Sequence, residues 1–246
     1  DIGLDRGQIG DTKIVFFERV GKKLLLVQPN YDYRASSVDK NEKRAVKESF
    51  ASSTIASFVI EEEQTGHLLV DATSFFVKDT HGAADKIKAM RQGTYSFNEP
   101  RSAMYFNNTK NFPLNSEFEA SITFTGGADA GRFVTSVTPS PEAITLRMHY
   151  SFVQLPDNQY KIRKYDIRSG YFGISYYDYS SDFTTPIEQK FISRHRLAKK
   201  DPAVQVSEPV TPIVYYLDNG TPEPIRSALL EGGRWWNQAF EAAGYK

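Results

Sequence analysis

Short runs of β-branched and aromatic residues, broken by Gly, Pro, Asn and Asp, dominate the chain from residue 11 to about residue 200. Residues 117–125 alternate along their whole length: Phe118 and Ile122 fall on an apolar side, and Glu117 and Glu119 on a polar side. This alternation predicts a strand with one face against a core and the other toward water.

The other strand patterns follow one another at short intervals. The first two, residues 13–19 and 22–28, are separated by Val20 and Gly21, which is the length of a tight hairpin turn. Later strands are predicted at residues 132–138, 144–154, 160–168, 171–179 and 187–197. Short connections favour antiparallel neighbours, and helical patterns occur here only at residues 42–51 and 83–90. The predicted fold class is mainly β (α+β): an antiparallel twisted sheet or sandwich with small helices.

The pattern changes after Lys199 and Lys200. Three prolines, Pro202, Pro209 and Pro212, follow within eleven residues and predict an extended connector. We therefore expect a β-rich module at residues 1–200, a Pro-rich connector at 201–212 and a separate segment at 213–246.

The last segment has the pattern of a strand followed by a long helix. Residues 212–218 are apolar on both faces, which is typical of a central strand covered on both sides. Thr221 and Pro222 predict a helix start, and Gly244 predicts its C-terminal cap. An apolar stripe runs along the helix at Ile225, Ala228, Leu229, Trp236, Phe240 and Ala243, and Trp235 covers its edge. About 35 residues cannot bury such a strand alone, so we expect this segment to begin a second, α/β domain.

Composition narrows the chemistry. Among the 246 residues, 30 basic side chains balance 30 acidic ones, which argues against nucleic acid as a partner. The absence of cysteine excludes disulfides and thiolate chemistry. No run of apolar residues is long enough for a transmembrane segment. The basic residues Lys190, Arg194, Arg196, Lys199 and Lys200 are interpreted as surface or interdomain contacts.

The usual catalytic motifs have no match. None of the four histidines, His67, His81, His149 and His195, begins a His-Glu-x-x-His zinc motif. His149 shares a strand face with Arg147 and Ser151 and is expected at the surface. The glycine cluster at 126–131 lacks the ending of a phosphate loop and predicts a flexible hairpin loop. A carboxylate pair distant in sequence is still open, and residues 61–63, three glutamates, predict a solvated strand end. We therefore expect no catalytic and no metal-binding residue in this chain.

Aromatic residues offer a binding surface instead. Strand alternation in residues 171–179 places Tyr171, Tyr177 and Tyr179 on one face. Such a row can stack on sugar rings or on a peptide, unless another layer of the protein covers it.

Several segments resemble a family of secreted bacterial zinc-dependent metalloproteases, in which a domain of unknown function precedes a zincin catalytic domain. They are residues 146–156 (LRMHYSFVQLP), 165–172 (YDIRSGYF), 191–202 (FISRHRLAKKDP), 207–218 (SEPVTPIVYYLD), 224–226 (PIR) and 236–245 (WNQAFEAAGY). The likeness covers most of the chain and is strongest from Tyr165 onward.

This resemblance implies that residues 213–246 are the first strand and helix of the zincin domain, and that the zinc motif lies beyond them. Zinc is then expected in the full-length protein and not in this fragment, which would be inactive alone. The implied partners are the downstream peptidase domain and a protein or peptide substrate. The implied location is extracytoplasmic: secreted, periplasmic or envelope-attached. Two alternatives stay open, a stand-alone glycan- or peptide-binding module and a hydrolase with a carboxylate pair.

Overall fold

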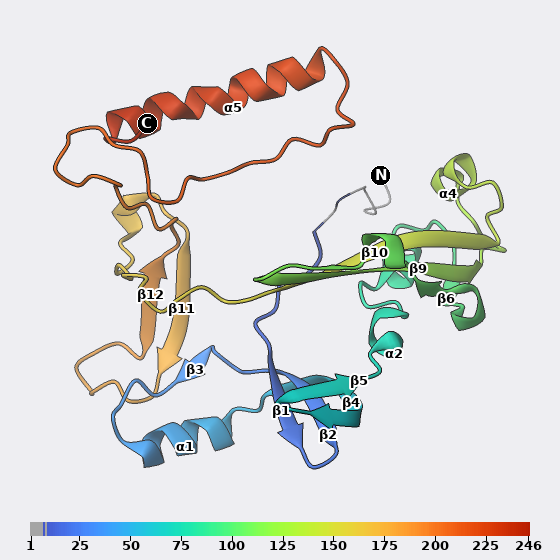
Figure 1. The fold of residues 1–246 in the computed structure, drawn as a ribbon, viewed down its shortest axis with the longest axis horizontal. Helices are drawn as coiled ribbons and strands as arrows, with labels where there is room; N and C mark the ends of the chain where they lie inside the picture. The colour runs from blue at the N-terminus through green and yellow to red at the C-terminus, as the bar shows by residue number, and fades with distance from the viewer. Residues whose placement is uncertain (1–6, 8) are drawn as a thin grey trace. The chain divides into compact units, whose positions relative to one another are not determined.

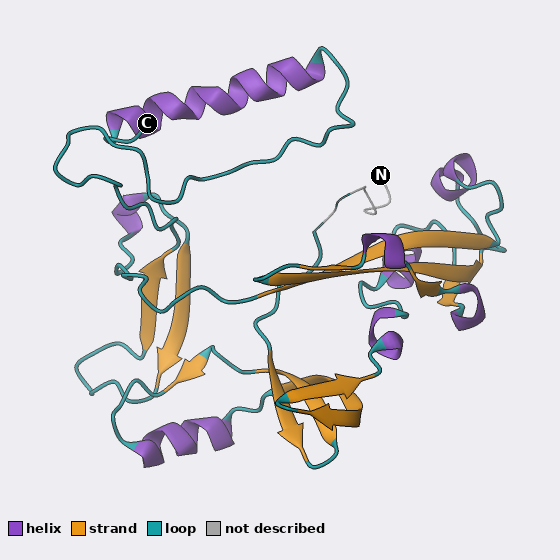
Figure 2. Cartoon of the chain, in the orientation of Figure 1, coloured by secondary structure: helices purple, strands orange, loops and turns teal. Residues whose placement is uncertain are grey.

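A computed structural model describes residue 7 and residues 9–246. Its chain divides into two units (Figure 1). The first unit comprises residues 1–157 and 178–184, and the second comprises residues 158–177 and 185–246. Strands and loops account for most of both units (Figure 2), so the predicted mainly β, antiparallel α+β class with small helices is confirmed. In the described part, no helix combines the length and apolarity that crossing a bilayer requires.

The first unit contains a four-stranded antiparallel sheet in the order β1-β2-β4-β5. Its strands are β1 (Phe16–Val20), β2 (Lys23–Gln28), β4 (Ser53–Gln64) and β5 (His67–Val70). The pairing of Val20 with Lys23 leaves Gly21 and Lys22 as a two-residue turn. The predicted hairpin is thus confirmed, with its turn one residue later. Gly21 has a φ of 59°, a conformation that glycine adopts without steric cost.

The second sheet of this unit is built around one long strand. It contains β6 (Tyr95–Phe97), β7 (Ala103–Met104), β8 (Lys110–Asn111), β9 (Asn115–Gly126) and β10 (Ala143–Val153). β10 pairs with one edge of β9, and β6, β7 and β8 pair in turn with its other edge. Every one of these pairings is antiparallel, as the short connections predict.

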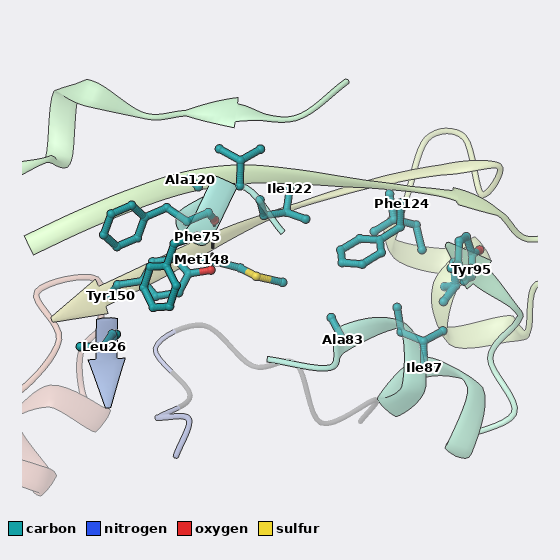
Figure 3. Close-up of a cluster of buried hydrophobic side chains, with 14 of the residues drawn as sticks. Leu26, Phe75, Ala83, Ile87, Tyr95, Ala120, Ile122, Phe124, Met148 and Tyr150 are labelled. Carbon is teal, nitrogen blue, oxygen red and sulfur yellow. Dashed lines mark hydrogen bonds between the residues drawn. The ribbon is translucent and has the colours of Figure 1, made fainter. Parts of the chain in front are cut away.

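The core lies on the apolar face of β9 and β10 (Figure 3). Ala120, Ile122 and Phe124 are fully buried there, as the alternation predicts. Two helices, α2 (Thr73–Phe76) and α3 (Ala83–Ala89), supply much of the facing layer. Besides these β9 residues, the core includes Leu26 and Phe58 of the first sheet, Phe75 of α2, Ile87 of α3, and Met148 and Tyr150 of β10.

The polar face of β9 is less exposed than the alternation predicts. Glu119 and Thr123 retain only 7% and 4% of their accessible surface. The chain between β6 and β8, which includes the 3₁₀ turns η1 (Glu99–Arg101) and η2 (Phe106–Asn108), bonds along the edge of β9 and covers this face. For example, the Thr123 hydroxyl donates to the carbonyl of Arg101 over 2.7 Å.

Short helices occur near their predicted positions, and two further ones, α2 and a helix at residues 132–137, were not predicted. Helix α1 (Lys40–Ser49) is capped by Asp39, whose carboxylate accepts the N–H of Asn41 at 2.7 Å. Helix α4 (Arg132–Val137) replaces the strand predicted at 132–138. Val134 of this helix is buried in the core. Tertiary packing therefore overrides the β propensity of the segment. The unit also contains the two-residue strand β3 (Tyr33–Arg34).

The second unit contains an antiparallel pair, β11 (Gly173–Asp178, whose last residue belongs to the first unit) and β12 (Glu188–Ile192). The strand predicted at 160–168 is not regular. This segment forms an isolated bridge between Lys164 and Phe191 and then a 3₁₀ turn, η3 (Ile167–Ser169). The division at residues 1–200, 201–212 and 213–246 stays a prediction.

The predicted strand at 212–218 is absent, and this segment is irregular. Tyr215 and Tyr216 are 89% and 94% exposed, because the described part of the chain provides no neighbouring strand or covering layer for them. The long helix is present as α5 (Ile225–Ala242), starting three residues beyond Pro222. Gly244 caps it as predicted: Tyr245 N–H donates to Phe240 at 2.8 Å, and Gly244 N–H donates to Glu241 at 2.9 Å, which is a Schellman arrangement.

Candidate functional site

A cluster of polar and charged side chains lies on the outer face of β9 and β10. We define the polar face as Glu117 and Glu119 of β9 together with Arg147, His149 and Ser151 of β10. The strand register places His149 directly opposite Glu119 and Ser151 opposite Glu117. Alternation puts these side chains on the same side of both strands, away from the core.

His149 lies between the two carboxylates. Its Nε2 is 2.7 Å from Oε2 of Glu117, and its Nδ1 is 3.6 Å from Oε2 of Glu119. Ser151 Oγ donates to Glu117 Oε1 over 2.8 Å, and an Arg147 nitrogen donates to Glu119 Oε1 over 3.0 Å. Glu117 is therefore hydrogen-bonded to two side chains of the neighbouring strand and Glu119 to one, with His149 beside it.

Side chains from outside β10 complete the network. Asn115 donates to Glu117, and Asn108 donates to Glu119 over 2.7 Å. The Arg147 guanidinium lies 3.4 Å from the centre of the Tyr105 ring. A hydrogen bond from Arg147 lowers the pKa of Tyr105, and the same contact raises the pKa of Arg147.

The pKa values of both glutamates are lower than usual. Burial raises the pKa of Glu119, but hydrogen bonds from Asn108 and Arg147 and the charge of Arg147 outweigh it. Burial likewise raises the pKa of Glu117, and hydrogen bonds from Asn115, Ser151 and His149 outweigh it. Both side chains are thus held as carboxylates. A hydrolase that uses a carboxylic acid needs one member of the pair with a raised pKa, and this pair has none.

The polar face does not form a zinc site. Among the described residues, no group of three or more His, Cys, Asp or Glu side chains is arranged to hold a metal ion. The family resemblance places its zinc site beyond this chain, and we assign no reaction step to zinc here.

An open cleft lies next to the polar face, at the turn between β8 and β9. Its volume is about 570 Å³, and its lining residues are Asn111, Phe112, Pro113, Leu114, Asn115, Ser116, Phe152 and Gln154. Asn115 connects the two features, since it lines the cleft and donates to Glu117. Amide groups beside aromatic rings can bind polar groups of a ligand and cover its apolar parts.

The three tyrosines predicted as a binding face are partly exposed. Tyr171, Tyr177 and Tyr179 retain 50%, 42% and 52% of their accessible surface. Tyr177 lies within β11, Tyr171 precedes that strand, and Tyr179 follows it. The Tyr179 ring contacts Phe50, with ring centres 5.1 Å apart. Tyr171 and Tyr177 belong to the second unit and Tyr179 to the first, so a shared binding face stays a prediction.

A buried aspartate next to Tyr179 gave no signal in the sequence. Asp178 accepts the backbone N–H groups of Ser36 and Ser180, each at 3.1 Å, and the Ser180 hydroxyl at 2.7 Å. Burial raises its pKa, but these hydrogen bonds outweigh burial and lower the pKa to about 2. Asp178 thus ties two distant segments of the first unit together.

The glycine cluster at 126–131 joins β9 to α4, and not directly to a second strand as predicted. A side chain at Gly127 would lie 2.4 Å from the carbonyl oxygen of Pro141, so the chain passes too closely here for another residue. The start of α4 is already occupied, because Gln92 Oε1 accepts the N–H of Phe133 at 2.9 Å. The cluster therefore has a structural role and does not bind phosphate through this helix.

Comparison with known proteins yields one family. No curated protein and no solved structure matches the chain. Residues 7–200 match the model of a domain of unknown function, DUF5117, and this match covers well over half of the chain. The chain therefore belongs to the DUF5117 family.

Proposed function

We propose that this chain is the noncatalytic β-rich module of a larger, extracytoplasmic zinc-dependent metalloprotease, in which a downstream domain hydrolyses peptide bonds. The similarity to metalloprotease segments supports this proposal, since it continues beyond the 7–200 match through residues 207–245. In the downstream domain, a zinc-activated water would attack the peptide carbonyl and a glutamate would act as base.

The observation that carries the proposal is the uncovered apolar stripe of α5. Ile225, Leu229 and Trp236 are 54%, 53% and 70% exposed, and no residue of this helix is buried by the described part of the chain. A surface helix normally buries such a stripe, and packing supplies most of its stability. Burial of the surface that these three side chains still expose would contribute about 1–2 kcal/mol each. We propose that the peptidase domain provides the covering surface.

The coding sequence beyond Lys246 tests this proposal directly. We expect it to continue and to encode a His-Glu-x-x-His motif. A stop codon directly after Lys246, or several hundred codons without the motif, would contradict the proposal.

Hydrogen exchange then tests the covering surface. In the product of the complete gene, amides of α5 should exchange far more slowly than in the 246-residue chain, because packing stabilises the helix. The even-numbered residues of β9 and β10 already bond to each other in this chain, so their amides serve as the internal control and should change little. Equal exchange of α5 in both proteins would contradict the proposed contact.

The second candidate is a glycan- or peptide-binding module. The partial exposure of Tyr171 and Tyr177, both in the second unit, supports it, since buried rings could not stack on a ligand. A glycan array or peptide pulldown should then give binding that Tyr177→Ala removes. Tyr31→Ala is the matched control, because Tyr31 is similarly exposed, at 46%, and lies outside this group. Equal binding by both variants would argue against the tyrosine face.

A further inference from the structure

β10 forms the outer edge of its sheet. Two hydrogen bonds define which of its residues face β9: Gly126 N–H donates to Glu142, and Gln154 N–H donates to Leu114. In an antiparallel pair, residues alternate between facing the partner strand and facing away. The even-numbered residues of β10 therefore bond to β9, and the odd-numbered ones direct their N–H and C=O groups outward.

The hydrogen bonds of β9 confirm this alternation. Its odd-numbered residues Glu119 and Thr123 accept the N–H groups of Tyr105 and Asn98 on the opposite edge, at 2.7 and 2.8 Å. On β10, the corresponding outward residues have no backbone partner among the described residues. They are Thr145, Arg147, His149, Ser151 and Val153, whereas the outward N–H of Ala143 donates to the carbonyl of Ser140 over 3.1 Å.

This edge has few of the features that normally protect a sheet edge. The register of β9 and β10 runs without a bulge from residue 143 to residue 153, and the strand contains no proline, glycine or lysine. Unpaired N–H and C=O groups on a long regular edge are a template for another strand.

The side chains of β10 favour an acidic partner. The strand contains no aspartate or glutamate, and its polar side carries Arg147 and His149, whose side chains are 43% and 51% exposed. The carboxylates that His149 and Arg147 contact, Glu117 and Glu119, lie on the inner side of the pair, so the outer side of both cations is open to an added strand. Opposite charges directly across a strand pair are favourable, so an added strand should place acidic side chains here.

We propose that the outer edge of β10 binds an extended acidic peptide as an additional antiparallel strand. Main-chain hydrogen bonds would provide the affinity, and Arg147 and His149 would select acidic side chains. The cleft at the end of β10, which Phe152 and Gln154 line, would receive the end of the peptide. This inference does not depend on the proposed peptidase role.

The geometry makes a specific demand on the peptide. In an antiparallel pair, residues that exchange hydrogen bonds have side chains on the same face. The N–H groups facing β10 must therefore belong to the acidic residues, because these lie opposite the outward-facing Arg147 and His149. The probe is a fluorescent peptide of about ten residues that alternates valine and glutamate, a length that spans a typical strand.

Fluorescence anisotropy measures its binding to the 246-residue chain. N-methylation of every glutamate should abolish binding, N-methylation of every valine should leave it intact, and replacement of glutamate by lysine should weaken it strongly. No binding of the parent peptide, equal effects of the two methylations, or equal binding of the lysine peptide would overturn the proposal. These comparisons leave the protein unchanged, so protein misfolding cannot explain them.

Two protein variants test the same edge. Val153→Pro removes an outward N–H that β9 does not use, a position where proline is tolerated, so it should lose binding while Val153→Ala retains it. Arg147→Gln should weaken binding about two- to fivefold, the range of a cross-strand charge pair, and Arg168→Gln should not. If Val153→Pro instead dissociates a dimer and the free peptide does not compete, the edge pairs with a second copy and the proposal is wrong.

Discussion

Glu119 offers the sharpest test of the polar face, because a buried carboxylate can be compared with an exposed one. Glu119→Gln keeps the shape of the side chain but removes its charge. The wild-type side chain is 9% exposed and accepts hydrogen bonds from Asn108 and Arg147. Hydrogen bonds to a charged group contribute roughly 1.5–3 kcal/mol each, and glutamine retains part of both. We expect a loss of about 1–3 kcal/mol in the free energy of unfolding of the first unit.

The control is Glu63→Gln. Glu63 forms an ion pair with Arg19 at 2.8 Å, but both side chains are about half exposed, at 52% and 48%. Exposed ion pairs contribute about 0–1 kcal/mol, so this variant should unfold almost as the wild type does. The same substitution thus has two expected outcomes, and burial distinguishes them.

Urea unfolding, followed by hydrogen–deuterium exchange in peptides covering β9 and β10, measures the effect in this unit alone. The pKa of Glu119 is lowered from 4.5, so the unfolded state binds its proton first as the pH falls. Its contribution is present above pH 4.5 and is lost as the pH falls through the lowered value. The wild type and Glu119→Gln should therefore converge in acid. Equal losses for both variants at neutral pH, or a difference that grows in acid, would refute the reasoning.

Three further predictions concern the first unit and α5. Phe124→Ala should destabilise the first unit by about 3–5 kcal/mol, since Phe124 is fully buried. Phe133 is half exposed, so Phe133→Ala should destabilise the unit far less in the same urea titration. Gly127→Ala should lower the free energy of unfolding by more than about 1 kcal/mol, because the φ of Gly127 is +75° and neighbouring atoms fill the space a side chain would need. Gly232→Ala is the control: this glycine lies in α5 with open space around it, so alanine should raise the helical circular dichroism signal. Asp178→Asn should lower the free energy of unfolding by roughly 1–2 kcal/mol at neutral pH. In a pH titration of stability, the variant and the wild type should converge near pH 2, where the lowered pKa of Asp178 lies.

Sequence periodicity predicted the elements whose signals are local. The hairpin of β1 and β2, the apolar face of β9 and the cap at Gly244 follow from alternation, turn length and glycine placement. Periodicity was wrong where packing decides the outcome. The segment 132–138 has strand-forming residues but folds as α4, where Val134 packs into the core and the Phe133 N–H donates to Gln92. Residues 213–218 are apolar enough for a strand, but a strand needs partners that the described residues do not supply.

The polar face could be predicted only in part. Alternation placed Glu117 with Glu119 and His149 with Arg147, each pair on one side of its own strand. Which carboxylate meets which cation depends on the register of β9 and β10, and no local pattern specifies that register. Asn108 reaches Glu119 from a separate turn, and its contribution required the tertiary structure.

Chelator-sensitive proteolysis tests the proposed function most directly. The product of the complete gene and the 246-residue chain would be incubated with unfolded casein, with and without EDTA, and the fragments identified by mass spectrometry. We predict that the complete product cleaves casein, that EDTA abolishes cleavage and added zinc restores it, and that the 246-residue chain is inactive. Cleavage by the 246-residue chain alone, or a complete product that is inactive or insensitive to EDTA, would contradict the proposal.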